Sequence, residues 1–201
     1  MQRTAIVVPL KPFDSAKSRL RAGGLTDVTA LARSLATGVL LAASPRPAFV
    51  VGESPDLADF AREVGATYLG SSATTLNEAV HYAYREVSPH CDVVVIAHGD
   101  LQFPSGLGEF APGSGVTIVT DLHGRGTNVL AVPANTDFRF HYGPTSARDH
   151  HLEAERCGLA VTVVTQHPWQ YDLDEPSDMQ KRGSVDPLFH RPMNWRDGVT
   201  T

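Results

Sequence analysis

The sequence predicts a single-domain α/β protein in which helices cover both faces of a mostly parallel β-sheet. Apolar runs of strand length alternate with segments of helical periodicity, which is typical of successive βαβ units. A chain of 201 residues with a hydrophobic fraction of 42% is enough to bury a substantial core. The predicted strands are Ala5–Pro9, Ala48–Gly52, Ala66–Leu69, Val93–His98, Gly115–Thr120, Val129–Pro133 and Ala160–Thr165.

Helices are expected between several of these strands. Thr26-Asp27 can cap the first of them, and apolar residues then recur at helical spacing from Leu31 to Leu40. Gly158 is a typical residue for ending the last one. The other predicted helices are Pro55–Val64, Thr75–Val87 and Ser146–Gly158.

The C-terminal part of the sequence has a different character. Prolines recur from Pro168 onward, and no strong periodicity follows Met179. We therefore expect the domain to span residues 1–186 and an irregular tail to span residues 187–201.

Composition excludes several classes of protein. A net charge of -5 argues against a general nucleic-acid or membrane-surface binder. No apolar run approaches the roughly 18 residues of a membrane span, and no signal-peptide pattern is present, so the cytoplasm is expected. Two cysteines without CxxC spacing make neither a metal motif nor a disulfide framework. The histidines show no HxxxH or HExxH pair.

The loop after the first predicted strand carries three cations, Lys11, Lys17 and Arg19. In open α/β sheets, ligands bind just beyond the carboxyl ends of the strands. Several cations at that position suit a polyanion such as a nucleoside triphosphate. From these residues alone, a solvated basic loop is the alternative. With Pro9 at the end of the strand, the loop is a candidate nucleotide-binding segment.

Acidic residues occupy two places that a sheet could bring together. Asp100 follows the apolar run Val93–Ala97, although a turn or helix-capping aspartate is the alternative there. Asp172 and Asp174 project to the same side if their segment is extended. Near Asp100 they would form an oxygen-rich site for Mg²⁺, whereas an acidic surface strand leading into a helix is the alternative.

Cations after the first strand and acids after a later one together indicate metal-assisted nucleotidyl transfer. Neither a Walker motif nor a GxGxxG fingerprint is present, which argues against kinases and dehydrogenases. The segment from Asp121 to Asn128 holds two glycines between two predicted strands. It is either a simple turn or a backbone cradle for an anion.

Several short motifs between about Ala5 and Met179 occur in the order and spacing of one known protein family. The chain is similar to the phospholactate/phosphoenolpyruvate guanylyltransferases of deazaflavin coenzyme (coenzyme F-420) biosynthesis. These are small, molybdopterin-guanylyltransferase-like nucleotidyltransferases with a Rossmann-like, nucleotide-diphospho-sugar-transferase-like fold. The matching motifs are Val8–Pro12, Ala16–Leu20, Leu76–Ala79, Gly99-Asp100, Gly124–Asn128, Phe140–Ser146 with His150, and Asp172–Asp178.

The resemblance implies a reaction and its substrates. GMP would pass from GTP to the phosphate of phosphoenolpyruvate or 2-phospho-L-lactate, with Mg²⁺ as cofactor and pyrophosphate as the leaving group. The family is compatible with a homodimer and with hand-off of an unstable product to a downstream transferase. No nucleic acid or membrane is implied as a partner.

The resemblance also implies roles for individual residues. The candidate catalytic residues are Lys17, Arg19 and Asp100, and the candidate metal ligands are Asp100 and Asp174. Nucleotide binding is implied for Pro9, Lys11, Lys17, Asn77 and Asp100, and acceptor binding for Thr127, Gly143 and Ser146. Apart from the resemblance, His98 is expected to line the exit of the strand that leads to Asp100, and His150 to cap or support the acceptor-side helix.

Two departures from the family pattern leave the acceptor and the base open. Gln102 stands where the family usually has the proline of an Asp-Leu-Pro motif, and Thr75 stands where it usually has glycine. Phosphoenolpyruvate, 2-phospho-L-lactate and 3-phosphoglycerate are not distinguished by the sequence. A nucleotidyltransferase acting on a sugar phosphate or with another nucleotide is the alternative. A nucleotide-binding relative without activity is disfavoured, because the acids and cations are all retained.

Overall fold

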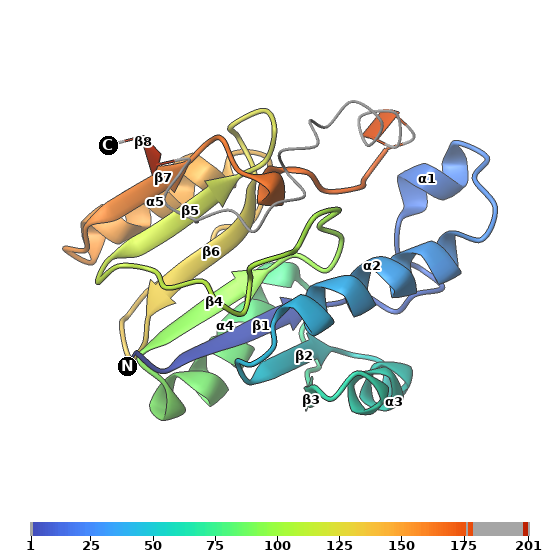
Figure 1. Ribbon diagram of the computed structural model, residues 1–201, viewed down its shortest axis with the longest axis horizontal. Helices are drawn as coiled ribbons and strands as arrows, with labels where there is room; N and C mark the ends of the chain where they lie inside the picture. Colours follow the sequence, from blue (N-terminus) through green and yellow to red (C-terminus); the bar gives the residue numbers. More distant parts are fainter. Residues whose placement is uncertain (1, 176, 179–198, 201) are drawn as a thin grey trace.

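The computed structural model describes residues 2–175, 177, 178, 199 and 200 and confirms the α/β fold (Figure 1). Its eight-stranded sheet has the order β3-β2-β1-β4-β6-β5-β7-β8. The strands are β1 Thr4–Pro9, β2 Ala48–Gly52, β3 Thr67–Gly70, β4 Val93–Ala97, β5 Val116–Thr120, β6 Thr127–Pro133, β7 Val161–Val164 and β8 Val199–Thr200. The helices are α1 Ser18–Ala22, α2 Val28–Ala42, α3 Pro55–Glu63, α4 Leu76–Val87 and α5 Ser146–Arg156, with 3-10 turns η1 Ser88–His90 and η2 Pro168–Gln170.

The sheet is mostly parallel, as predicted. β1 pairs in parallel with β2 and with β4, β2 pairs in parallel with β3, and β5 pairs in parallel with β7. β6 runs against β4 and β5 because it returns through a hairpin, and β8 runs against β7. The carboxyl ends of β1, β2 and β4 therefore meet at one edge of the sheet, the place where ligands bind in this architecture.

Helices cover both faces of the sheet, which explains why the central strands are apolar throughout. α2 and α3 pack over the face to which Ile6 and Val8 belong, and α4 and α5 pack over the face of Val7 and Val94. Successive strand residues point to opposite faces, so a strand covered on both sides has no solvated positions. All five residues of β4 are buried.

The segment between Asp121 and Asn128 is a turn. The Asp121 carboxylate accepts hydrogen bonds from the backbone N–H groups of His123 and Arg125, at 3.0 and 2.9 Å. Gly124 adopts a positive φ of 69°, which a residue without Cβ tolerates best. The Gly124 N–H also donates within the turn, to the Asp121 carbonyl at 3.1 Å. With three of its N–H groups used internally, the segment fits a simple turn better than an anion cradle.

Besides the two 3-10 turns, a short helix and a short strand were not predicted. α1 forms within the basic loop, where Leu20 packs against Val28 and Leu173. β8 pairs with the edge strand β7, whose backbone groups are open to a partner. The predicted domain boundary at 186/187 and most of the predicted tail lie outside the described residues. Among the described residues, no helix is both long and apolar enough to cross a membrane.

Candidate active site

A cavity of about 840 Å³ opens at the carboxyl ends of β1, β2 and β4, beside α1. A volume of this order suits a nucleotide-sized ligand. The sequence-predicted residues that line it are Pro9, Lys11, Lys17, Arg19, Asp100 and Asp174. The chain thus brings the basic loop and both predicted acidic segments to one place.

The ends of β1 and β4 approach each other closely at the cavity. A Cβ atom on Gly99 would lie 2.4 Å from Cδ2 of Leu10 and 3.3 Å from Cγ1 of Val8. Real Cβ atoms essentially never lie as near as 2.4 Å to another heavy atom, so a larger residue here would displace the Leu10 side chain, whereas glycine lets the two loops pack together. The turn that carries Asp100 is therefore held directly against the loop that carries Lys11.

The second acidic segment is fixed to the first through its backbone. Asp172 forms an antiparallel bridge with Leu101. The backbone N–H of Gln102 donates to the Tyr171 carbonyl at 2.8 Å, and its side-chain amide donates to the Asp172 carbonyl at 2.8 Å. A proline at this position could make neither bond, so the departure from the family motif gives this chain two extra ties between its acidic segments.

Lys17 connects the two acidic segments. Its ammonium forms ion pairs with both carboxylates, one with Asp100 and one with Asp174 Oδ1 at 2.8 Å. The Lys17 side chain is 9% exposed. Its backbone has a φ of 58°, in the left-handed region that is uncommon for a residue with a Cβ. This conformation turns the chain into α1, whose Leu20 is buried against Leu173.

The charges in this cluster stabilise one another. Burial works against the charge of Lys17, but Asp100 and Asp174 outweigh it and raise the pKa of the ammonium. Burial likewise opposes the charge of Asp100, yet Lys17 and then His98 hold the pKa of its carboxyl below the ordinary value. Both groups are charged at neutral pH.

Burial shifts the pKa values of two neighbouring groups, Asp172 and His98, toward their neutral forms. Burial, followed by the charges of Asp100 and Asp174, raises the pKa of the Asp172 carboxyl to about 7. For His98, burial lowers the pKa of the imidazole and exceeds the attraction of Asp100. Two carboxylates share the single ammonium of Lys17, so the cluster keeps a net negative charge that a further cation would relieve.

The carboxylates fit a hard divalent cation. Oδ1 of Asp100 is buried and makes no hydrogen bond within the described part of the chain. No group of three potential metal ligands is assembled among the described residues. Instead, the Lys17 ammonium stands between Asp100 and Asp174 as a cation of the protein's own. Carboxylate oxygens are the donors that Mg²⁺ prefers.

The other two cations of the loop are more open to solvent. Lys11 is exposed at the cavity. Arg19 is 69% exposed, and its nearest carboxylate oxygen, on Glu175, is 3.8 Å away. An ion pair of this kind contributes little to stability. Both side chains are thus available to an anionic ligand.

The three predicted acceptor residues lie beside the cavity but are not part of its lining. Thr127 begins β6, and Ser146 is the first residue of α5, with Thr145 rather than Ser146 at the N-cap. The Thr127 and Ser146 side chains are buried, and Gly143 is exposed. The two segments are neighbours, because the Ala147 N–H donates to the carbonyl of Arg125 at 2.9 Å.

Asn77 ties the acceptor segment to α4. Its side-chain nitrogen donates to the Tyr142 carbonyl at 3.1 Å, and its side-chain oxygen accepts from the Tyr142 N–H at 2.6 Å. The amide is thus engaged at both ends, and the residue does not line the cavity. In the structure its contacts are with the backbone next to Gly143.

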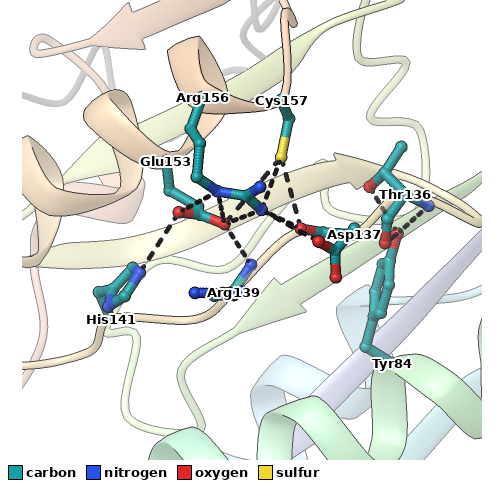
Figure 2. Close-up of polar contacts among 8 residues, drawn as sticks. All are labelled: Tyr84, Thr136, Asp137, Arg139, His141, Glu153, Arg156 and Cys157. Carbon is teal, nitrogen blue, oxygen red and sulfur yellow. Dashed lines mark hydrogen bonds and ion pairs between the residues drawn. The ribbon is translucent and has the colours of Figure 1, made fainter.

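Side chains of α5 hold the segment that leads to Tyr142 (Figure 2). The Glu153 carboxylate accepts from the backbone N–H of Arg139 at 2.9 Å and from Arg156 Nε at 3.0 Å. Glu153 also lies 3.6 Å from Nε2 of His141, and Arg156 donates to the Asp137 carbonyl. This buried carboxylate fixes residues 137–141 to the helix.

The sequence profile of the family described as guanylyl transferase CofC like matches residues 4–182 of the chain. This protein belongs to that family. The match covers β1 to β7 and both acidic segments, so it includes the whole cavity. Guanylyl transfer, and with it the nucleotidyltransferase class, follows from this membership.

Individual relatives agree with the family and with the fold. The phosphoenolpyruvate guanylyltransferase of Chloroflexus aurantiacus is 28% identical over 191 residues, covering 88% of this chain and 92% of the relative. The 2-phospho-L-lactate guanylyltransferase of Natronomonas pharaonis is 27% identical, covering 85% and 81%. A structure from Desulfovibrio desulfuricans, provisionally named a nucleotide-diphospho-sugar transferase, superposes with a TM-score of 0.71 at 16% identity, covering 98% and 94%. The predicted fold class is confirmed.

Glu153 of this guanylyl transferase was not singled out from the sequence, and Gln102 stood out only as a departure from the family motif. The backbone groups that each of them contacts are far away in sequence, so these contacts have no recognisable spacing. A Glu three residues before an Arg on a helix is commonly a solvated surface pair. Only the packing of α5 against residues 137–141 makes Glu153 a buried anchor.

Replacing Glu153 with glutamine should destabilise the guanylyl transferase by about 2 kcal/mol at pH 7, because hydrogen bonds to a charged group are lost. Arg156 hydrogen bonding is the main reason that the pKa of Glu153 falls from its ordinary 4.5 to about 2. A lowered pKa gives stability that is complete above pH 4.5 and is lost as the pH falls toward 2. The difference between wild type and Glu153→Gln should therefore shrink on acidification through that window.

Thermal or urea unfolding of both proteins between pH 7 and pH 3 measures this difference. Glu155→Gln is the matched control on the same helix, since the Glu155 side chain is 59% exposed and should matter little. A Glu153→Gln variant as stable as the control, or a gap that widens in acid, would contradict the assignment.

Proposed function

We propose that this protein transfers GMP from GTP to the phosphate of a three-carbon acid, phosphoenolpyruvate or 2-phospho-L-lactate, with Mg²⁺ as cofactor. The observation that carries the proposal is the meeting of Lys17, Asp100 and Asp174 in the cavity at the sheet edge. The names of the relatives supply the two acceptors. Metal-ligand and triphosphate contacts belong at this edge of the fold.

The reaction needs positioning more than proton transfer. A phosphate oxygen of the acceptor attacks the α-phosphorus of GTP, and the bond from that phosphorus to the oxygen bridging to the β-phosphorus breaks. Pyrophosphate leaves with the electron pair, and a new phosphoanhydride joins GMP to the acceptor. The attacking oxygen is already anionic, so no general base is required. Bringing two polyanions together is the main obstacle.

The residues of the cavity are suited to reducing the repulsion between the two anionic substrates. Asp100 and Asp174 would hold Mg²⁺, which supplies positive charge to the triphosphate when bound. Lys11 and Arg19, both exposed at the cavity, would contact the phosphates from the open side. Lys17 would turn from the carboxylates to the phosphate groups that leave, where charge gathers in the transition state.

We place the acceptor next to this site, at Thr127, Gly143 and Ser146. The beginning of α5 presents backbone N–H groups and a partial positive charge, which favour a phosphate or carboxylate. Gly143 is exposed, so a ligand can approach its backbone. Neighbouring Tyr142 is held from both sides, by Asn77 on α4 and through His141 by α5. The acceptor segment is thereby preorganised.

Turnover with defined substrates tests the function directly. The protein is incubated with GTP and MgCl₂ and with phosphoenolpyruvate, 2-phospho-L-lactate or 3-phosphoglycerate, and the product mass and the pyrophosphate are measured. We expect a GMP adduct with one of the first two acids and weaker turnover when ATP or CTP replaces GTP. Preference for 3-phosphoglycerate, or for another nucleotide with every acid, would overturn the substrate assignment.

Asn77→Ala separates two roles for this residue. Because its amide holds the backbone of Tyr142, we expect the acceptor KM to rise several-fold while the GTP KM changes less. Steady-state kinetics with each substrate varied in turn measures the split. A selective rise in the GTP KM would instead support the nucleotide contact that the family resemblance implies.

A further inference from the structure

The imidazole of His150 is buried completely and uses both of its nitrogens. Nε2 accepts a hydrogen bond from the backbone N–H of His141 at 3.0 Å. Nδ1 lies 3.1 Å from Oγ1 of Thr127. The ring stands edge-on to Tyr142, with ring centroids 4.8 Å apart. His150 thus connects the beginning of β6 to the segment before Gly143.

The contact with His141 determines which nitrogen carries the proton. A backbone N–H can only donate, so Nε2 must be unprotonated. Burial, followed by the charges of His141 and His98, lowers the pKa of His150 to about 3, so the ring is neutral at ordinary pH. A neutral imidazole has one N–H group, and here it must be on Nδ1.

The tautomer in turn sets the direction of the bond to Thr127. Nδ1–H donates, and Oγ1 of Thr127 accepts. The threonine hydroxyl therefore keeps its own hydrogen, and Oγ1 makes no other hydrogen bond among the described residues. With the opposite tautomer, the hydroxyl would donate to the ring and turn only lone pairs toward a ligand. An anion would be repelled by that arrangement.

We propose that His150 is a positioning residue that presents the hydroxyl hydrogen of Thr127 to the anionic acceptor. The inference rests on the proposed function, because it assigns Thr127 to the acceptor site. His150 itself does not touch the substrate. It selects for a ligand group that accepts a hydrogen bond, such as a phosphate or carboxylate oxygen, at the beginning of β6.

The tautomer can be observed without any turnover. Long-range proton–nitrogen correlation spectra of the protein labelled with ¹⁵N-histidine should contain one ring with protonated Nδ1 and unprotonated Nε2. Disappearance of that pattern in a His150→Asn sample assigns it to His150. A His150 ring with its proton on Nε2, or one that titrates near pH 6.5, would overturn the proposal whether or not the protein is active on phosphoacids.

Two variants divide the functions of the ring. His150→Asn can still offer an amide N–H to Thr127 but does not reach His141. His150→Gln can still accept from the His141 N–H but loses the donor to Thr127. With phosphoenolpyruvate as the probe acceptor, we expect His150→Gln to raise its KM about tenfold and His150→Asn to raise it less than threefold. The GTP KM should be unchanged in both.

A Thr127→Val background completes the test. Valine keeps the shape of threonine and removes the hydroxyl, so His150→Gln should then cause no further rise in the acceptor KM. Equal effects of His150→Gln with and without the Thr127 hydroxyl would show a merely structural role and overturn the proposal. Failure of the wild-type protein to use any phosphoacid would refute the proposed function instead. The spectra do not depend on turnover, so the two failures can be told apart.

Discussion

Replacing Asp100 with asparagine should lower guanylyl transfer by at least about a hundredfold, the range found when a preorganised charge-stabilising group is lost. Asn keeps the volume of the side chain and removes its charge. In the structure, Oδ2 of Asp100 pairs with Lys17, and Oδ1 is buried without a hydrogen bond among the described residues. On the proposed assignment, loss of the charge would weaken both the binding of Mg²⁺ and the placement of Lys17.

Initial rates with GTP and phosphoenolpyruvate across a series of Mg²⁺ concentrations measure the effect. Part of the loss should return at high Mg²⁺, because a weaker site is filled by mass action. Asp14→Asn is the matched control, since its carboxyl is exposed on the same loop as Lys11 and lies outside the cavity. Near-normal activity of Asp100→Asn at moderate Mg²⁺, or an equal loss in the control, would contradict the metal-site assignment.

Most of the sheet could be predicted from the sequence because its strands are buried on both faces. Runs such as Val93–Ala97 have one interpretation once helical segments flank them, and strands β1 to β7 agree with the predicted ones within two residues at each end. The short helix α1 could not be predicted in the same way. Its one buried side chain, Leu20, gains its environment from Leu173, which is far along the chain.

The candidate site, too, could be predicted only in part. Cations after β1 and acids after β4 were predictable because the ends of parallel strands must meet. Whether Asp172 joins them depends on an antiparallel bridge to Leu101 that has no sequence signature. The hydrogen bonds of Asn77 to Tyr142 were equally hidden, since a surface-facing Asn at the start of a helix is compatible with many partners.

The ion pairs of Lys17 lead to the second large expected effect. Replacing Lys17 should lower turnover but raise the affinity for Mg²⁺. Lys17→Met removes the ammonium and keeps a long side chain in its place. Turnover should fall by at least about tenfold, because the charge that would stabilise the leaving pyrophosphate is gone. Affinity for Mg²⁺ in the absence of nucleotide should rise by about tenfold, or about 1.4 kcal/mol, because Asp100 and Asp174 lose a competing cation.

Calorimetric titration of the nucleotide-free protein with MgCl₂ or MnCl₂ measures the second effect, and steady-state kinetics measures the first. Arg19→Met is the matched control, because Arg19 lies at the same cavity but contacts neither Asp100 nor Asp174. It should weaken GTP binding and leave the affinity for the bare metal unchanged. If the lysine merely supported the fold, Lys17→Met would lower both turnover and metal affinity. Metal affinity rises while turnover falls only if the cation that is removed occupies the metal position itself. Unchanged or weaker metal binding by Lys17→Met would therefore refute this role.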